Sequence, residues 1–157
     1  MIFVTTNGTR AIADTASACR VLLGNLRNAR AVARHLEASD TDSIYLVCAG
    51  SAGRFTVEDF LGAATILSYL DVDGWRLNDG AWMALDFTER HREDISGVLK
   101  QSRAGRWFVD NDRMDAFDFV ADVGASGLVP EVVGGELRRA GEPESEPVPG
   151  TSQGGIG

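Results

Sequence analysis

The sequence predicts an α/β domain in which a mostly parallel sheet is flanked by helices, followed by a helical C-terminal part and a disordered tail. Up to about Asp71, short β-rich runs alternate with helical patterns, which is typical of a parallel sheet with crossover helices. Beyond residue 140 the chain is rich in Pro, Gly, Ser and Glu, and it buries too little apolar surface to fold. We therefore expect one domain over residues 1–140 and a disordered tail over residues 141–157.

Three β-rich runs each precede a helix-compatible segment. The runs are IFVTT, CRVLLG and SIYLVCAG, and the segments that follow are Arg10–Ser17, Leu26–Glu37 and Val57–Leu70. The second segment predicts an amphipathic helix, because its apolar residues share one face: Leu26, Ala29, Val32, Ala33 and Leu36. In a parallel sheet the intervening loops meet at one edge, where ligands bind. These loops are Asn7–Arg10, Asn25–Asn28 and Ala49–Thr56.

The signal beyond DVDGW changes from alternating to mainly helical. Helices are predicted over Asn78–Arg90, Glu93–Ser102 and Arg113–Val123, and LVPEVV predicts a short final strand. Asn78 is the first residue of its segment, directly before DGAWMAL, and suits an N-cap.

Composition and charge limit the classes of partner. The net charge of −8 argues against nucleic acid. No apolar run approaches the ~20 residues of a membrane span, and no secretion signal opens the chain, so we expect a cytoplasmic protein. Cys19 and Cys48 are too few for a disulfide framework and are expected to be reduced, buried thiols. Fourteen arginines against the single Lys100 suit local binding of a small phosphorylated anion.

The stretch VTTNGTRA, Val4 to Ala11, predicts a strand–turn–helix corner. Asn7 and Gly8 suit a turn, while Thr9 and Arg10 leave it at the start of a helix-compatible segment. Backbone N–H groups and a helix N-terminus at such a corner can face an anion.

A second stretch, CAGSAGRFTVED, carries two alternative interpretations of its acidic residues. Thr56 and Asp59 fit a capping box at a helix start, which would give Asp59 a structural role. Carboxylates of Glu58, Asp59 and Asp79 could instead hold Mg²⁺, which prefers carboxylates, water and phosphate oxygens.

The same stretch also contains Cys48 and Arg54 in a Cys-x5-Arg spacing. In cysteine-dependent phosphatases this spacing lets a thiolate attack phosphorus while the arginine holds the remaining oxygens. A thiolate at a helix N-terminus beside an arginine would have a lowered pKa. A buried cysteine at a strand end is the structural alternative.

Taken together, the blocks TTNGTRA, NARAVARHL and VCAGSAGRFTVEDFLGAATI resemble the 2-phosphosulfolactate phosphatase family in order and interval. The later LNDGAWMAL and SRAGRWFVDNDRMDAFDFVA resemble its C-terminal portion more loosely. The resemblance extends from about Phe3 to Val133. Family members carry a further Asp- and Arg-bearing segment before the first block. We therefore expect this chain to correspond to the C-terminal two-thirds of a member, truncated at its N-terminus.

The resemblance implies Mg²⁺-dependent hydrolysis of 2-phospho-3-sulfolactate on the route to coenzyme M. It implies catalytic roles for Arg10, Arg54 and Cys48. The substrate-binding candidates are Asn7, Gly8, Thr9 and Gly50, and the metal candidates are Glu58 and Asp59. Arginines and loop N–H groups would neutralise the phosphate and sulfonate, and Mg²⁺ would polarise the phosphoryl group.

Two alternatives to this metal-dependent phosphatase remain open at the level of sequence. One is the cysteine-dependent phosphatase that uses Cys48 and Arg54. The other is an inactive fragment that binds an anion or pairs with another subunit, because missing strands would leave an unpaired sheet edge that favours homo-oligomers.

Overall fold

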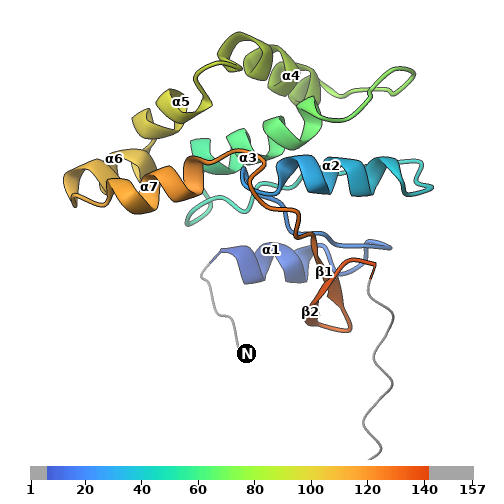
Figure 1. Cartoon of the computed structure of the whole chain (residues 1–157). Coiled ribbons are helices and arrows are strands. Elements are labelled where there is room, and N and C mark those ends of the chain that lie inside the picture. The colour runs from blue at the N-terminus through green and yellow to red at the C-terminus, as the bar shows by residue number, and fades with distance from the viewer. Residues whose placement is uncertain (1–6, 142–157) are drawn as a thin grey trace, which may run out of the picture.

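The structure of the protein is a computed structural model, and it describes residues 7–141. Helices dominate this part of the chain (Figure 1). The helices are α1 (Gly8–Asp14), α2 (Ala29–Glu37), α3 (Val57–Ser68), α4 (Asp79–His91), α5 (Ile95–Gln101), α6 (Arg103–Asp110) and α7 (Met114–Ala121), and the strands are β1 (Pro130–Val133) and β2 (Glu136–Arg139).

Helix α3 is the centre of the fold. It contacts α2, α4 and α5, while α6 and α7 pack beside α5 (Figure 1). Buried residues occur around more than one side of α3, among them Leu61, Ala64 and Ile66. A helix that is apolar on several sides is buried between other elements, so the apolar faces of this chain meet helix against helix.

Three groups of buried side chains form the core, and α3 contributes to each. Leu61 packs with Leu26 and with residues of α5 and α7. Ile66 packs with α2 and Val129, and Ala64 and Leu67 pack with Ala84 of α4. The amphipathic face predicted for the segment Leu26–Glu37 is confirmed, because its members Leu26, Ala29, Val32 and Ala33 are all buried.

The prediction of a mostly parallel sheet is wrong for the described residues. Their one sheet has two strands, β1 and β2, which pair antiparallel with Pro130 opposite Arg139. Gly134 and Gly135 join them, both at positive φ, as a two-residue hairpin loop requires. The predicted final strand LVPEVV is therefore present, and its partner β2 was not predicted.

The run CRVLLG is extended, but it pairs antiparallel with β1. Leu22 forms a bridge with Glu131, Leu23 N–H donates to the Pro130 carbonyl at 2.8 Å, and Val132 N–H donates to the Val21 carbonyl at 2.9 Å. The run IFVTT lies outside the described residues.

The run SIYLVCAG forms no ladder with any segment of residues 7–141. Its side chains alternate as in a strand, since Leu46 packs against the core while Tyr45 and Val47 are 85% and 57% exposed. A strand needs a neighbour for its backbone hydrogen bonds, whereas a helix satisfies its own. The predicted strand is therefore not formed among the described residues, although the alternation of exposed and buried side chains holds over Tyr45, Leu46 and Val47.

The predicted helices are confirmed within a few residues at each end. The Asn78 cap is also confirmed, because its side chain accepts a hydrogen bond from Ala81 N–H at 2.8 Å. Helix α6 was not predicted. Both cysteines are free, as expected, but the expectation that they are buried is wrong, because Cys19 and Cys48 are both exposed.

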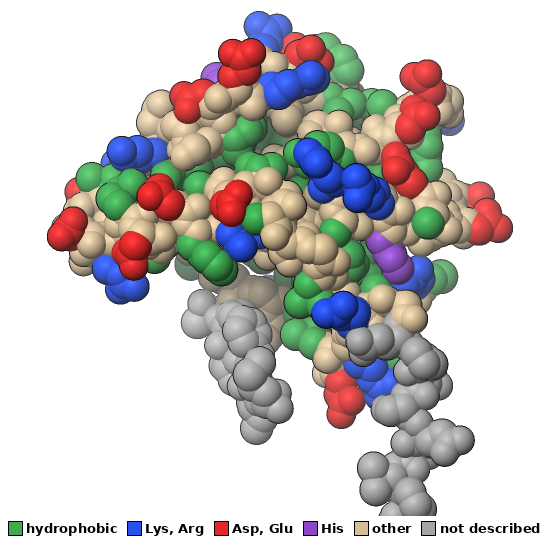
Figure 2. Space-filling model, viewed as in Figure 1, with side chains coloured by type: hydrophobic (Ala, Val, Ile, Leu, Met, Phe, Trp, Pro, Cys, Tyr) green, Lys and Arg blue, Asp and Glu red, His purple; other side chains and the backbone are tan. Residues whose placement is uncertain are grey.

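Apolar side chains reach the surface between interspersed acidic and basic ones (Figure 2). In the described range, none of the helices combines the length and apolar character needed to cross a bilayer. The predicted tail from residue 142 onward lies outside the described residues.

Candidate functional site

The first candidate segment begins at Asn7, directly before α1. Gly8, Thr9 and Arg10 form the first turn of this seven-residue helix, which buries no side chain. Asn7 Oδ1 does not cap α1 but accepts a hydrogen bond from Ala52 N–H at 3.2 Å. This bond joins the two blocks that the sequence placed at one edge.

The second segment is a tight loop before α3. Ser51 N–H donates to the Arg54 carbonyl at 2.9 Å, and Arg54 N–H donates back to the Ser51 carbonyl at 3.1 Å. Between them Ala52 and Gly53 have φ of 51° and 73°, so both central residues are left-handed, as in a type I′ turn. Gly50 is also left-handed, and a Cβ there would lie 2.8 Å from the Arg54 carbonyl oxygen.

Most N–H groups of this loop already have acceptors inside the protein. Gly50 N–H donates to Asp59 Oδ2 at 2.5 Å, Ala52 N–H donates to Asn7, and Ser51 and Arg54 bond each other. In this conformation the loop is closed on itself, so the expected cradle of loop N–H groups around a phosphate is not formed. Any positive charge offered to a phosphate here must therefore come from side chains such as Arg10 and Arg54.

The capping-box prediction is wrong. Thr56 occupies the N-cap position of α3, but no side chain caps this helix. Asp59 points to Gly50 instead, and it thereby fixes the loop against the first turn of α3. The Thr56 hydroxyl is buried without any hydrogen-bond partner in the described part of the chain.

Glu58 and Asp59 do not converge on one point. Consecutive helix residues are rotated by about 100°, and Glu58 lines a hollow toward α6 while Asp59 contacts the loop. Within residues 7–141, no group of three or more His, Cys, Asp or Glu side chains is placed to hold a metal ion. Asp79 starts α4, at the other end of α3. Asp59 Oδ1 has no hydrogen bond to any described residue, whereas Asp59 Oδ2 accepts from Gly50 N–H. One free carboxylate oxygen can serve as a single Mg²⁺ ligand among waters and phosphate oxygens.

The two candidate arginines are exposed. Arg10 Nε lies 3.7 Å from Asp14 Oδ2, with both side chains in solvent. Such a pair is weak, so the Arg10 guanidinium can exchange this partner for a ligand. Arg54 makes only backbone hydrogen bonds in the part of the chain that is described.

The expected lowering of the Cys48 pKa is wrong. Although Cys48 is exposed as a residue, neighbouring protein atoms keep part of the solvent away from its sulfur, and this desolvation raises the pKa of the thiol. The negative charge of Asp59 raises the pKa further. Both effects disfavour the thiolate, which is the nucleophilic form. The direction of this pKa shift thus gives no support to a cysteine nucleophile.

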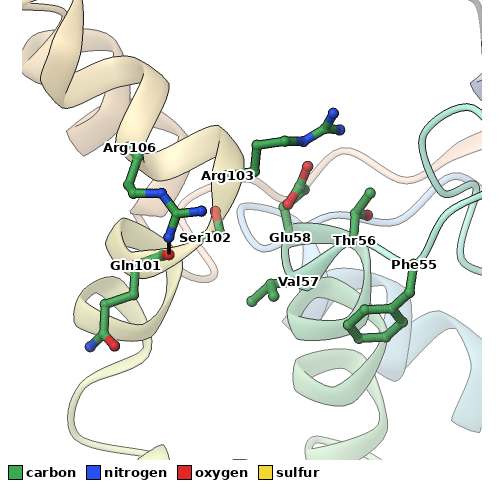
Figure 3. Close-up of a pocket in the computed structure, with 8 residues that line it drawn as sticks. All are labelled: Phe55, Thr56, Val57, Glu58, Gln101, Ser102, Arg103 and Arg106. Atoms are coloured by element: carbon green, nitrogen blue, oxygen red, sulfur yellow. Dashed lines mark hydrogen bonds between the residues drawn. The ribbon is translucent and has the colours of Figure 1, made fainter.

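Sequence reasoning missed an open hollow of about 330 Å³ between the start of α3 and the α5–α6 corner (Figure 3). One wall consists of Ser102, which is the N-cap of α6, and of Arg103 and Arg106 in α6. The opposite wall includes Thr56 and Glu58. Ser102 caps α6 by accepting from Gly105 N–H at 2.9 Å. The sequence SRAGR, residues 102–106, could have indicated this wall. Ser102 is a favoured N-cap residue, and Arg103 and Arg106 are three residues apart, so they share a helix face.

Comparison of the sequence with known proteins identifies the class to which the chain belongs, which is a family of phosphatases. The match is to the family described as 2-phosphosulpholactate phosphatase, and it extends over residues 1–135. The chain belongs to this family, as its sequence blocks predicted.

Several relatives named probable 2-phosphosulfolactate phosphatase are similar to the chain. One from Deinococcus radiodurans is 36% identical and covers 90% of this chain and 59% of its own length. One from Symbiobacterium thermophilum is 32% identical and covers 87% of the chain and 59% of its own length. A third, from Caldanaerobacter subterraneus, is 31% identical, with 88% and 57% covered. The chain thus spans less than two-thirds of these relatives.

Proposed function

We propose that the chain is a cytoplasmic phosphoric monoester hydrolase that releases phosphate from 2-phospho-3-sulfolactate, with Mg²⁺ as cofactor, on the route to coenzyme M. The observation that carries this proposal is the family match over residues 1–135. The structure supports it by joining Asn7, the loop 50–54 and Asp59 through direct hydrogen bonds.

We assign roles in the proposed reaction to four residues: Arg10, Arg54, Gly50 and Asp59. Arg10 and Arg54 neutralise the negative charge of the substrate, because guanidinium groups bind phosphate oxygens in bidentate fashion. Gly50 N–H fixes Asp59 Oδ2, so that Asp59 Oδ1 is oriented toward a ligand. Asp59 would hold the Mg²⁺, which when bound would polarise the phosphoryl group and lower the pKa of a coordinated water.

The first test is phosphate release from 2-phosphosulfolactate by the purified chain, with Mg²⁺ and with excess EDTA. We expect turnover that requires Mg²⁺. Folded protein that gives no turnover in either condition would overturn the activity proposed for this chain. Turnover that survives EDTA and disappears in Cys48→Ser would support the cysteine-dependent mechanism instead.

A comparison of two arginine variants tests whether Arg54 contacts the substrate. Arg54→Gln should lower kcat/KM by about 10- to 100-fold, because a charge-assisted contact to phosphate is lost. Arg92→Gln is the matched control, since Arg92 lies at the end of α4 with only an exposed contact to Glu89. Equal activity of the two variants would contradict the role of Arg54.

The role of Asp59 needs a readout other than turnover. Addition of Mg²⁺ should raise the melting temperature of the unmodified chain, because a ligand that binds the folded state stabilises it. Asp59→Asn should remove this shift. An unchanged shift in the variant would exclude Asp59 as the ligand.

A second candidate function is association with another copy of the chain. Its basis is the extended run 43–50, which has no ladder partner among residues 7–141 and exposes Tyr45 and Val47. Such edges pair with further strands unless charges block them. Light scattering after size exclusion should give a dimer mass that Val47→Lys reduces to a monomer. A monomer of the unmodified chain would contradict this function.

A further inference from the structure

Helix α1 carries Arg10 but takes no part in the core of the described protein. It buries no side chain, and among residues 7–141 the three core groups include no residue of α1. Figure 1 shows it apart from the helices α2–α7, on the same side as β1 and β2. A helix of seven residues is also too short to be stable alone. The position of α1 therefore depends on the bonds that the chain makes at its two ends.

At the N-terminal end, α1 begins beside the loop 50–54. Asn7 Oδ1 accepts a hydrogen bond from Ala52 N–H at 3.2 Å, and Arg10 follows within the first turn of the helix. A hydrogen bond between neutral groups is weaker than one in which either partner is charged. This contact therefore needs support from the other end of α1.

At the C-terminal end, the helix continues into a turn with its own hydrogen bonds. The Thr15 hydroxyl donates to the Ala11 carbonyl at 2.9 Å, and Ala18 N–H donates to the Thr15 carbonyl at 3.0 Å. Only residues 15–19 lie between α1 and Arg20. Arg20 directly precedes the backbone bonds between Val21 and β1. A displacement at Arg20 is thus passed to α1 through a short, bonded segment.

The Arg20 side chain joins three elements at this point. Its Nε and Nη2 donate to the two carboxylate oxygens of Glu131 in β1, at 2.7 and 3.0 Å. Nη1 donates to Ser39 Oγ, just beyond α2, at 3.3 Å, and Nη2 lies 2.8 Å from His35 Nε2 in α2. A guanidinium only donates, so His35 Nε2 is the acceptor. A planar, bidentate contact fixes the orientation of both groups as well as their distance.

We propose that Arg20 is a positioning residue: by joining Glu131 and His35 it sets the place of α1 and holds Arg10 beside the loop 50–54. Arg20 itself does not contact the substrate. Its effect on the reaction rests on the proposed hydrolysis, whereas the placement of α1 is measured without turnover. Failure of one is therefore distinguishable from failure of the other.

The first test is amide hydrogen exchange of the full chain, followed by NMR. Arg20→Gln should speed exchange about tenfold at Ala52, whose N–H bonds Asn7, and at Thr15, whose N–H bonds the Ala11 carbonyl. Both bonds open when α1 moves. Exchange in α3 should not change. Unchanged exchange at Ala52 and Thr15 would overturn the proposal.

Arg90→Gln is the matched control for this experiment. Arg90 donates to both carboxylate oxygens of Asp86, at 2.9 and 3.0 Å, so the variant loses a pair of the same geometry. That pair lies within α4 and joins no second element. Exchange at Ala52 and Thr15 should therefore match the unmodified chain. Equally fast exchange in Arg90→Gln would mean a general loss of stability, and would overturn a role specific to Arg20.

The second test separates positioning from stability by kinetics. Arg20→Gln should raise KM for 2-phosphosulfolactate about tenfold with little change in kcat, as expected when binding of the ground state and of the transition state weaken equally. A loss of folded protein would lower the apparent kcat instead. An unchanged KM in an active variant would overturn the link to the site.

A double variant tests whether Arg20 acts through Arg10. Arg10→Gln should also raise KM, and adding Arg20→Gln to it should have no further effect, because the position of α1 no longer matters without the guanidinium. Independent, multiplying effects on KM would overturn the link between the two residues. If the chain has no turnover, the proposed hydrolysis fails and the exchange results alone decide the role of Arg20.

Discussion

Helix α3 and the segment that leads into it, residues 43–54, differ in how they obtain their hydrogen bonds. Helix α3 satisfies its own backbone and buries apolar side chains against α2, α4 and α5. The preceding segment has one apolar side chain against the core, Leu46, and then a loop closed by contacts to Asn7 and Asp59. Stability therefore resides in the helix, whereas the chemistry of the candidate site resides in the loop.

The largest expected effect on stability comes from comparing a buried apolar residue of α3 with an exposed one in the preceding segment. Leu61→Ala removes a side chain with 0% exposure in the core, and it should lower the free energy of unfolding by about 2–5 kcal/mol. Val47→Ala, at a position that is 57% exposed, should change it by less than about 0.5 kcal/mol. Urea denaturation followed by circular dichroism measures both. Similar losses would show that the segment 43–50 is as well packed as α3.

A smaller effect is expected inside the loop, where Gly50 and Gly53 have similar φ angles but different surroundings. Gly50 and Gly53 have φ of 68° and 73°. A Cβ at Gly53 meets nothing within 4 Å, while one at Gly50 lies 2.8 Å from the Arg54 carbonyl oxygen. Gly53→Ala should cost about 1 kcal/mol from the left-handed φ alone, and Gly50→Ala about 1 kcal/mol more. Urea unfolding of both variants measures this difference.

Gly50→Ala should also weaken the bond to Asp59, and hence the Mg²⁺-induced rise in melting temperature. Gly53→Ala is the control that leaves this bond in place. Equal costs in the two variants would mean that the close approach at Gly50 relaxes easily.

The same contrast explains what the sequence could predict. Helix positions could be predicted from local spacing, because the buried apolar residues of a helix recur within a single segment. Leu26 and Val32 in one segment and Leu61 in the next are examples, and all three are buried. The sheet could not be predicted in this way, since pairing depends on residues distant in the chain. Glu131, for example, lies opposite Leu22, and no local pattern in either run indicates that partner.

The candidate site was predicted in part for the same reason. The blocks around Asn7 and Gly50 were correctly expected to meet. The hydrogen-bond partners of these blocks could not be predicted, because an Asp at position 59 suits both a capping box and a contact to the loop. Asp59 fits both patterns, and only the fold decides that it binds Gly50. The α3–α6 hollow was missed because its walls are distant in sequence.

The smallest expected effect compares a long-range ion pair with a local one. Arg20 donates to both carboxylate oxygens of Glu131, at 2.7 and 3.0 Å, and so ties the run 19–24 to β1. The Glu131 side chain is only 14% exposed. The hydrogen bond from Arg20 lowers the pKa of Glu131, against the opposing effect of burial. Asp86 and Arg90 instead pair within one turn of α4, in solvent.

A carboxyl whose folded-state pKa is depressed stabilises the fold above its unfolded value, and this contribution is lost as the pH falls through the folded pKa. Glu131→Gln should therefore lower the free energy of unfolding at neutral pH by about 1 kcal/mol. The gap between variant and unmodified chain should shrink as the pH falls below about 4.5, the ordinary value for this group. Asp86→Asn should show a smaller, salt-sensitive change, because exposed pairs are screened. Urea unfolding at a series of pH values tests this, and a gap that persists in acid would mean that Glu131 contributes through packing, not charge.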